Sequence, residues 1–121
     1  MQLYVPFNDE SLIYGARHMT DDTTVFVHGA SGMSLKSLHE DTPLFVVAHG
    51  RYSRADQIGG EVKGFFGKKT VFLTASELMN YLSKDGLPRR FLDLRLMVCW
   101  SGYVGGESRW GSHTLKRKAD A

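Results

Sequence analysis

The feature that most constrains the fold is a series of short apolar runs rich in β-branched and aromatic residues. The runs are about five residues long, which is the usual length of strands and shorter than most buried helices. Several are almost uninterrupted by polar residues, as in strands that are covered on both faces. They predict about five strands, at residues 2–7, 23–27, 44–48, 69–73 and 93–98.

One clear helix and two shorter ones accompany these runs. Residues 75–84 carry an apolar stripe at helical spacing, and Gly86 and Pro88 follow as stop signals. Shorter helices are predicted at 9–18 and 34–40. A helix between two strands forms a strand–helix–strand unit, which usually joins parallel strands by a right-handed crossover. The fold class is therefore predicted as α/β, a mostly parallel sheet of about five strands flanked by helices.

The length indicates a single domain over residues 1–121. The chain has one cysteine and cannot form an internal disulfide, which favours a reducing compartment. Its first residues lack the basic start and apolar stretch of a signal peptide, and no run approaches a membrane helix in length. We expect a cytoplasmic protein, or one delivered into a host cytosol without a cleaved signal peptide, and no membrane partner.

Charge gives little information about partners. The formal net charge is +2, and only the segment 111–121 is locally basic. We interpret that segment as a flexible basic tail, which does not favour a nucleic-acid partner. The glycine-rich segment 51–68 has no sustained periodicity and predicts a loop or a small hairpin.

A histidine and the only cysteine each follow an apolar run, fifty positions apart. His49 and Gly50 come directly after run 44–48, and Cys99 follows run 93–98. If the two runs are neighbouring parallel strands, both side chains lie at the carboxyl edge of the sheet, where ligands bind. A histidine beside a cysteine favours the nucleophilic thiolate. The backbone N–H groups of Gly50 and Cys99 would then hold an oxyanion.

These residues resemble the caspase-like cysteine peptidases, which include caspases, legumains, gingipains, clostripains and the self-processing domains of bacterial toxins. Ala48-His49-Gly50-Arg51 resembles the histidine motif of the toxin domains. Cys99-Trp100-Ser101-Gly102 is similar to the Cys-x-Ser-Gly motif of legumains. The caspase motif Gln-Ala-Cys-x-Gly is not matched, although the spacing of about fifty residues is the caspase spacing.

The resemblance implies a caspase-like three-layer sandwich and a cysteine-type endopeptidase or self-processing domain, as found in bacterial effectors and toxins. His49 would be the general base, Cys99 the nucleophile, and a protein or peptide the substrate. No cofactor is implied. Further residues are predicted to line the site: His28, Arg51, Trp100, Ser101 and Gly102.

Several alternatives stay open from the sequence. His28 also follows an apolar run and competes with His49 for the role of base. No metal site is predicted, because no His-x-x-x-His or Cys-x-x-Cys spacing occurs, although His28, His49 and Cys99 could assemble one. Cys99 could also be a small core residue. Only 19 residues follow Gly102, whereas the peptidases build their substrate pocket there, so a catalytically silent effector or partner-binding module is the second hypothesis.

Overall fold

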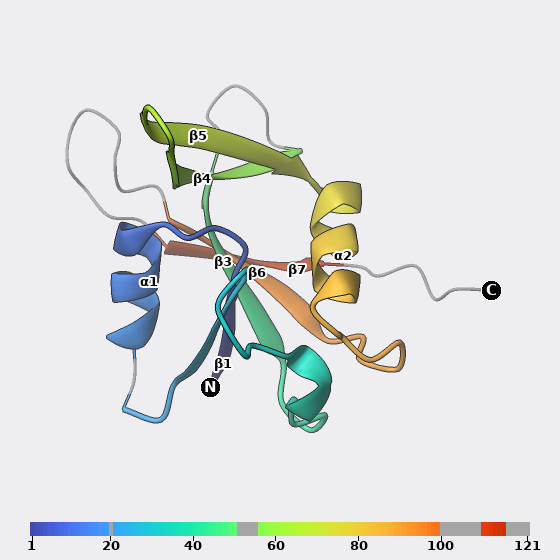
Figure 1. The fold of residues 1–121 in the computed structure, drawn as a ribbon. Coiled ribbons are helices and arrows are strands. Elements are labelled where there is room, and N and C mark those ends of the chain that lie inside the picture. Colours follow the sequence, from blue (N-terminus) through green and yellow to red (C-terminus); the bar gives the residue numbers. More distant parts are fainter. Residues whose placement is uncertain (20, 51–55, 100–109, 116–121) are drawn as a thin grey trace.

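The computed structural model describes residues 1–19, 21–50, 56–99 and 110–115, and shows a twisted sheet with a helix on each face (Figure 1). The strands are β1 (Gln2–Val5), β2 (Thr24–Val27), β3 (Leu44–Gly50), β4 (Gln57–Gly64), β5 (Gly67–Thr74), β6 (Leu94–Cys99) and β7 (Trp110–Leu115). The helices are α1 (Glu10–Arg17) and α2 (Ala75–Lys84). All five predicted strands and the helix at 75–84 are confirmed.

The sheet is mixed, so the prediction of a mostly parallel sheet was wrong. Strand β1 pairs in parallel with β2 and β3, and β3 pairs in parallel with β6. The pairs β3–β4, β4–β5 and β6–β7 are antiparallel. Along the chain, α2 connects β5 to β6, and these two strands run in the same direction. They are not neighbours in the sheet, because β3 and β4 lie between them. The parallel strands therefore form a central group extended by antiparallel strands.

The two unpredicted strands come from segments with weak strand signals. Strand β4 lies in the glycine-rich segment 51–68, for which the sequence left a loop or a small hairpin open. The structure has the hairpin, which is long and is formed by β4 and β5. Strand β7 includes residues 111–115, which the sequence assigned to a flexible tail; residues 116–121 lie outside the described part. Strand propensity depends on the neighbouring strand, and both segments pair with a strand that is itself strongly predicted.

Both helices begin at identifiable caps. Asp9 caps α1, and Thr74 forms a reciprocal capping box with Glu77 at the start of α2. The predicted helix at 34–40 is reduced to a 3₁₀ turn at Leu35–Ser37. Neither α1 nor α2 has the length and apolar content needed to cross a membrane, and no other helix of the described residues does.

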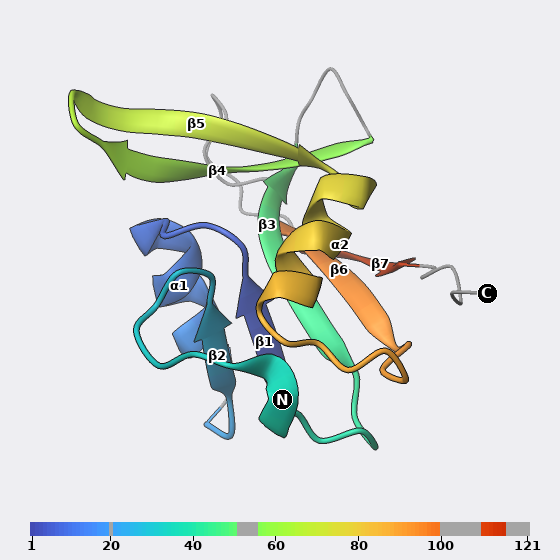
Figure 2. The same cartoon turned by 45° about the vertical axis from the view of Figure 1, so that its right-hand side comes forward.

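The two faces of the sheet carry different helices. Tyr4 in β1 is the register partner of Val46 in β3, so these residues share a face. Because side chains alternate along a strand, His49 is on the opposite face. Tyr4 contacts Asp85 at the end of α2, whereas His49 contacts Asp9 at the start of α1. Figure 2 shows the two helices on either side of the central strands. The finer likeness to a caspase-like sandwich stays a prediction.

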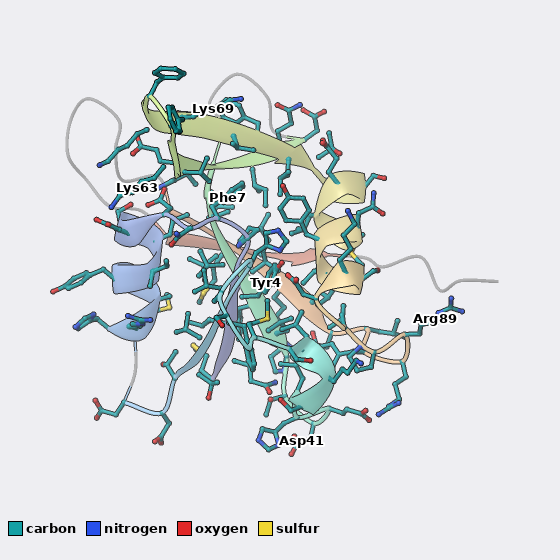
Figure 3. The ribbon with its side chains drawn as sticks, viewed as in Figure 1. Tyr4, Phe7, Asp41, Lys63, Lys69 and Arg89 are labelled. Atoms are coloured by element: carbon teal, nitrogen blue, oxygen red, sulfur yellow. The ribbon has the colours of Figure 1, made fainter. Side chains whose placement is uncertain are left out.

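One edge of β3 is shared by two strands, and this arrangement positions Asp9. Strand β1 pairs with the first half of β3, and β4 pairs with His49 and Gly50 at its end. The chain leaves β1 at Pro6, and the buried Phe7 ring packs against β4 (Figure 3). A Cβ atom on Gly60 would lie 2.3 Å from the Phe7 ring, so this contact requires glycine. Asp9 is thereby held between β4 and the end of β3.

Candidate active site

The structure places His49 and Cys99 side by side in the backbone register. They are Cα partners at the carboxyl ends of the parallel strands β3 and β6. Neighbouring strands are about 4.8 Å apart, so the two positions are adjacent. The predicted meeting of these strand ends is therefore confirmed for the backbone. The side chain of Cys99 lies outside the described part of the chain.

The nearest described acidic partner of His49 is Asp9. The His49 Nε2 atom lies 3.3 Å from the Asp9 Oδ2 atom. Ser11 lies beside the pair, with its Oγ atom 3.5 Å from the same nitrogen. The His49 side chain is 24% exposed and the Asp9 side chain 4%, so the carboxylate is buried behind an imidazole that solvent still reaches. This order of groups suits an acid that orients a base.

The Asp9 carboxylate is unusually well supplied with donors. Its Oδ1 atom accepts hydrogen bonds from the Ser11 N–H and Oγ–H and from the Leu12 N–H, at 3.0, 2.7 and 3.2 Å. Its Oδ2 atom accepts from the Glu61 N–H in β4 at 2.8 Å. Burial alone raises the pKa of Asp9, but the hydrogen bonds from His49, the Glu61 N–H, Ser11 and Leu12 outweigh it and hold the pKa well below its usual range. Asp9 is therefore ionised at neutral pH.

An ionised Asp9 determines which nitrogen of His49 carries the proton. A carboxylate accepts hydrogen bonds and cannot donate them, so it favours the tautomer with the proton on Nε2. The Nδ1 atom is then the basic nitrogen of the neutral ring. In Ser-His-Asp and Cys-His-Asn sites a third group orients the histidine in this way. Asp9 and His49 can therefore act together as an oriented base.

An open pocket borders this pair, between the start of α1 and the β4–β5 hairpin. Its walls include an ion pair between Glu10 and Lys63 with a separation of 2.7 Å. The pocket is lined by Asn8, Asp9, Glu10, Ser11, Glu61, Val62, Lys63 and Lys68. Asp9 and Ser11 belong to both the pocket and the His49 contacts, so a ligand in the pocket would lie next to the two residues that contact the candidate base.

The other predicted residues are placed separately. Gly50 is buried at the end of β3, opposite Ile58 of β4. His28 follows β2, which is separated from β3 by β1, and its Nδ1 atom lies 2.7 Å from the Asp85 Oδ2 atom on the α2 face. The structure therefore does not bring His28 to His49, either as a competing base or as a shared metal ligand. Arg51, Trp100, Ser101 and Gly102 lie outside the described residues.

His28 belongs to a second polar cluster. Asp85 accepts hydrogen bonds from His28 and from the Tyr4 hydroxyl, and the His28 ring stacks on Tyr81 with ring centroids 4.3 Å apart. Burial, followed by the hydrogen bond to Asp85, raises the pKa of Tyr4 above its usual range. The cluster joins β1, the end of β2 and the end of α2. We interpret it as a structural connection across the α2 face.

Asp9, Ser11 and Glu61 are the site residues that the sequence did not reveal. Asp9 is the first residue of the helix predicted at 9–18, and that position gives no indication of a contact with a residue forty positions later. Comparison of the chain with protein families, curated proteins and solved structures finds no match.

Proposed function

We propose that the chain is a cysteine peptidase or self-processing domain in which Cys99 is the nucleophile and His49 the base. The observation that carries this proposal is the register of His49 and Cys99 at the ends of adjacent parallel strands. Because register partners of neighbouring strands share a face of the sheet, we expect the thiol on the face where His49 meets Asp9. Asp9 is assigned as a positioning residue that orients the imidazole.

The proposed reaction uses these groups in two stages. Cys99 passes its proton to His49 Nδ1, and the thiolate attacks the carbonyl carbon of a peptide bond. The amide C–N bond breaks, the amine leaves with the proton from His49, and a thioester remains on Cys99. His49 then takes a proton from water, which hydrolyses the thioester and releases the carboxylic acid and the thiol. Asp9 keeps Nε2 protonated and stabilises the imidazolium formed in each stage.

The tetrahedral intermediates need donors for the developing oxyanion. The N–H groups of Gly50 and Cys99 are the proposed donors, because they belong to the two strand ends that meet at the site. The resemblance to caspase-like peptidases supports peptide bonds as the substrate and a caspase-like sandwich as the finer fold. A thiol nucleophile without a disulfide partner suits the reducing cytoplasm, where we place the activity.

A covalent probe and a hydrolysis assay together test the proposal. The full chain is incubated with peptidyl acyloxymethyl ketones, which alkylate catalytic thiols, and with a library of fluorogenic peptides. We expect a mass increase of one probe per chain and hydrolysis of a subset of peptides, with both lost in Cys99→Ser. His28→Ala is the matched control, because it removes an Asp-paired histidine from the other face. If the folded chain shows neither labelling nor hydrolysis, the result supports the silent binding module instead.

A further inference from the structure

The turn of the β4–β5 hairpin presents two phenylalanines entirely to solvent. Phe65 and Phe66 are 98% and 100% exposed, and they contact each other edge to face with centroids 5.3 Å apart. We call these two residues the aromatic tip. Figure 2 shows the turn between β4 and β5 at the far end of a ribbon that extends past α1. Large apolar side chains at a projecting end are costly in water unless something covers them.

The turn conformation does not require these residues. Gly64 and Gly67 are register partners, so Phe65 and Phe66 form a two-residue connection. Gly67 has a positive φ of 115°, whereas neither phenylalanine does. The position that needs glycine is thus already filled by Gly67, and polar residues would satisfy the two tip positions equally well. The turn geometry therefore leaves the two aromatic rings unexplained.

The surroundings of the aromatic tip are basic. Lys63, Lys68 and Lys69 flank it, and residues 63–69 contain no carboxylate. Lys63 pairs with Glu10 on α1, and Lys68 lies 4.0 Å from Glu61. Lys69 has no ion-pair partner among the described residues, and Figure 3 shows it on the β4–β5 hairpin. Apolar rings at a projecting end, with cations set behind them, are complementary to an anionic layer over an apolar interior.

We propose that the aromatic tip inserts into the headgroup region of a membrane that contains anionic lipid, while the flanking lysines contact the lipid phosphates. A projecting turn whose two phenylalanine side chains are almost fully exposed fits a deformable lipid surface better than a rigid protein pocket. This proposal departs from the expectation of no membrane partner, which was based on the lack of a membrane-spanning run. Insertion of a turn needs no such segment, so it is compatible with the helices described above. The inference is independent of the proposed peptidase activity, because neither Cys99 nor His49 takes part.

Vesicle co-sedimentation of the full chain tests this contact. Vesicles of phosphatidylcholine with phosphatidylserine should bind the protein, and vesicles of phosphatidylcholine alone should bind it weakly. The double variant Phe65→Ser/Phe66→Ser should lower the partition coefficient by more than about tenfold, because burying even one phenylalanine is worth about that factor. Lys68→Gln and Lys69→Gln should each lower it by about fivefold at low salt.

Controls separate insertion from other causes of sedimentation. Tyr14→Ser/Leu92→Ser removes two exposed apolar side chains away from the tip, which are 67% and 52% exposed, and should leave binding unchanged. Circular dichroism should show that all variants are folded, since the tip contacts little else. No vesicle binding by the wild-type chain, or binding that the tip variant retains, would overturn the proposal. Sedimentation velocity that shows tip-dependent self-association without vesicle binding would also overturn it, in favour of a second copy of the chain.

Discussion

Two aspartate–histidine pairs lie on opposite faces of the same sheet, and only one of them has its histidine in register with the cysteine. Asp9 and His49 meet on the α1 face at 3.3 Å, and Asp85 and His28 meet on the α2 face at 2.7 Å. The closer pair is the one on the face away from the proposed site. His49 is the register partner of Cys99, whereas His28 stacks on Tyr81. An aspartate beside a histidine is therefore not itself evidence of a catalytic site.

The carboxylates of the two pairs also differ. Asp9 is at the N-terminus of α1, where backbone N–H groups and the helix dipole stabilise negative charge. Asp85 is at the C-terminus of α2, where the dipole opposes negative charge and a buried tyrosine hydroxyl and His28 supply the hydrogen bonds. The first arrangement keeps an ionised acid behind a base. The second connects three elements, which is what a structural contact requires.

The largest expected difference between the two faces concerns hydrolysis. His49→Ala should lower kcat/KM for a peptide substrate by about 10³-fold or more, because it removes the base that activates the thiol. His28→Ala should change kcat/KM by less than about threefold, because His28 is on the other face of the sheet. A threefold change corresponds to less than the roughly 1.4 kcal/mol of a tenfold change. Steady-state kinetics on folded variants measures both. Equal losses in the two variants would mean that the faces are not functionally distinct.

The contribution of Asp9 to the free energy of unfolding should be largest at neutral pH. Asp9→Ala removes the cap of α1 and leaves the Glu61 N–H without its acceptor, so we expect a loss of about 2 to 4 kcal/mol in the free energy of unfolding. The folded-state pKa of Asp9 is lowered relative to about 3.9 in the unfolded chain, so its stabilising effect is present above that value. It is lost as the pH falls from about 4 toward the lower folded-state pKa.

Urea unfolding at several pH values measures this loss. The stability difference between wild type and Asp9→Asn should be largest near neutral pH and should shrink as the pH falls below about 4. Ser11→Ala is the matched control, because it removes one donor to Asp9 and keeps the cap and the Glu61 contact. A difference that grows on acidification would contradict the assigned charge of Asp9.

A substitution at Gly60 should disturb both the packing of β4 on Phe7 and the position of β4 beside Asp9. Gly60→Ala places a Cβ atom against the Phe7 ring, which should cost about 1 to 3 kcal/mol of stability and move β4 away from Asp9. Phe7→Leu should relieve much of this cost in the double variant, which a double-mutant cycle by urea unfolding detects. Strictly additive effects would show that the two residues do not press on each other.

The smallest effect is expected from the α2 face. Tyr4→Phe removes the hydroxyl that Asp85 accepts from and should lower the free energy of unfolding by about 1 to 2 kcal/mol. The variant should retain full reactivity at Cys99. Thermal unfolding together with thiol labelling checks both expectations. A loss of thiol reactivity in this variant would show that the two faces are coupled.

The sequence predicted the elements that have strong local signals. The strands around Val25, Val46 and Leu96 and helix α2 follow from apolar runs and caps, and the neighbouring ends of β3 and β6 follow from the same runs. Strand β4 was left open between a loop and a small hairpin, because its three glycines and interspersed charges give a weak strand signal and its pairing with β5 and β3 depends on distant residues. The mixed sheet could not be predicted without β4 and β7.

The candidate site was predictable only in part, for a similar reason. His49 and Cys99 could be proposed because each ends an apolar run, and that signal is local. Asp9 reaches His49 only because Phe7 packs on Gly60 and brings the start of α1 beneath β4. This arrangement joins segments about fifty residues apart, and no local pattern encodes it. His28 carried the same local signal as His49, and only the face of the sheet distinguishes them.

The rate of Cys99 alkylation by iodoacetamide as a function of pH tests the central claim most directly. We predict that the native chain reacts near pH 6 much faster than a free cysteine, whose pKa is about 8.5, because His49 stabilises the thiolate. The rate should fall in His49→Ala and stay unchanged in His28→Ala. A thiol that reacts only after denaturation, or at the same rate in wild type and His49→Ala, would contradict the claim that Cys99 and His49 form a catalytic pair.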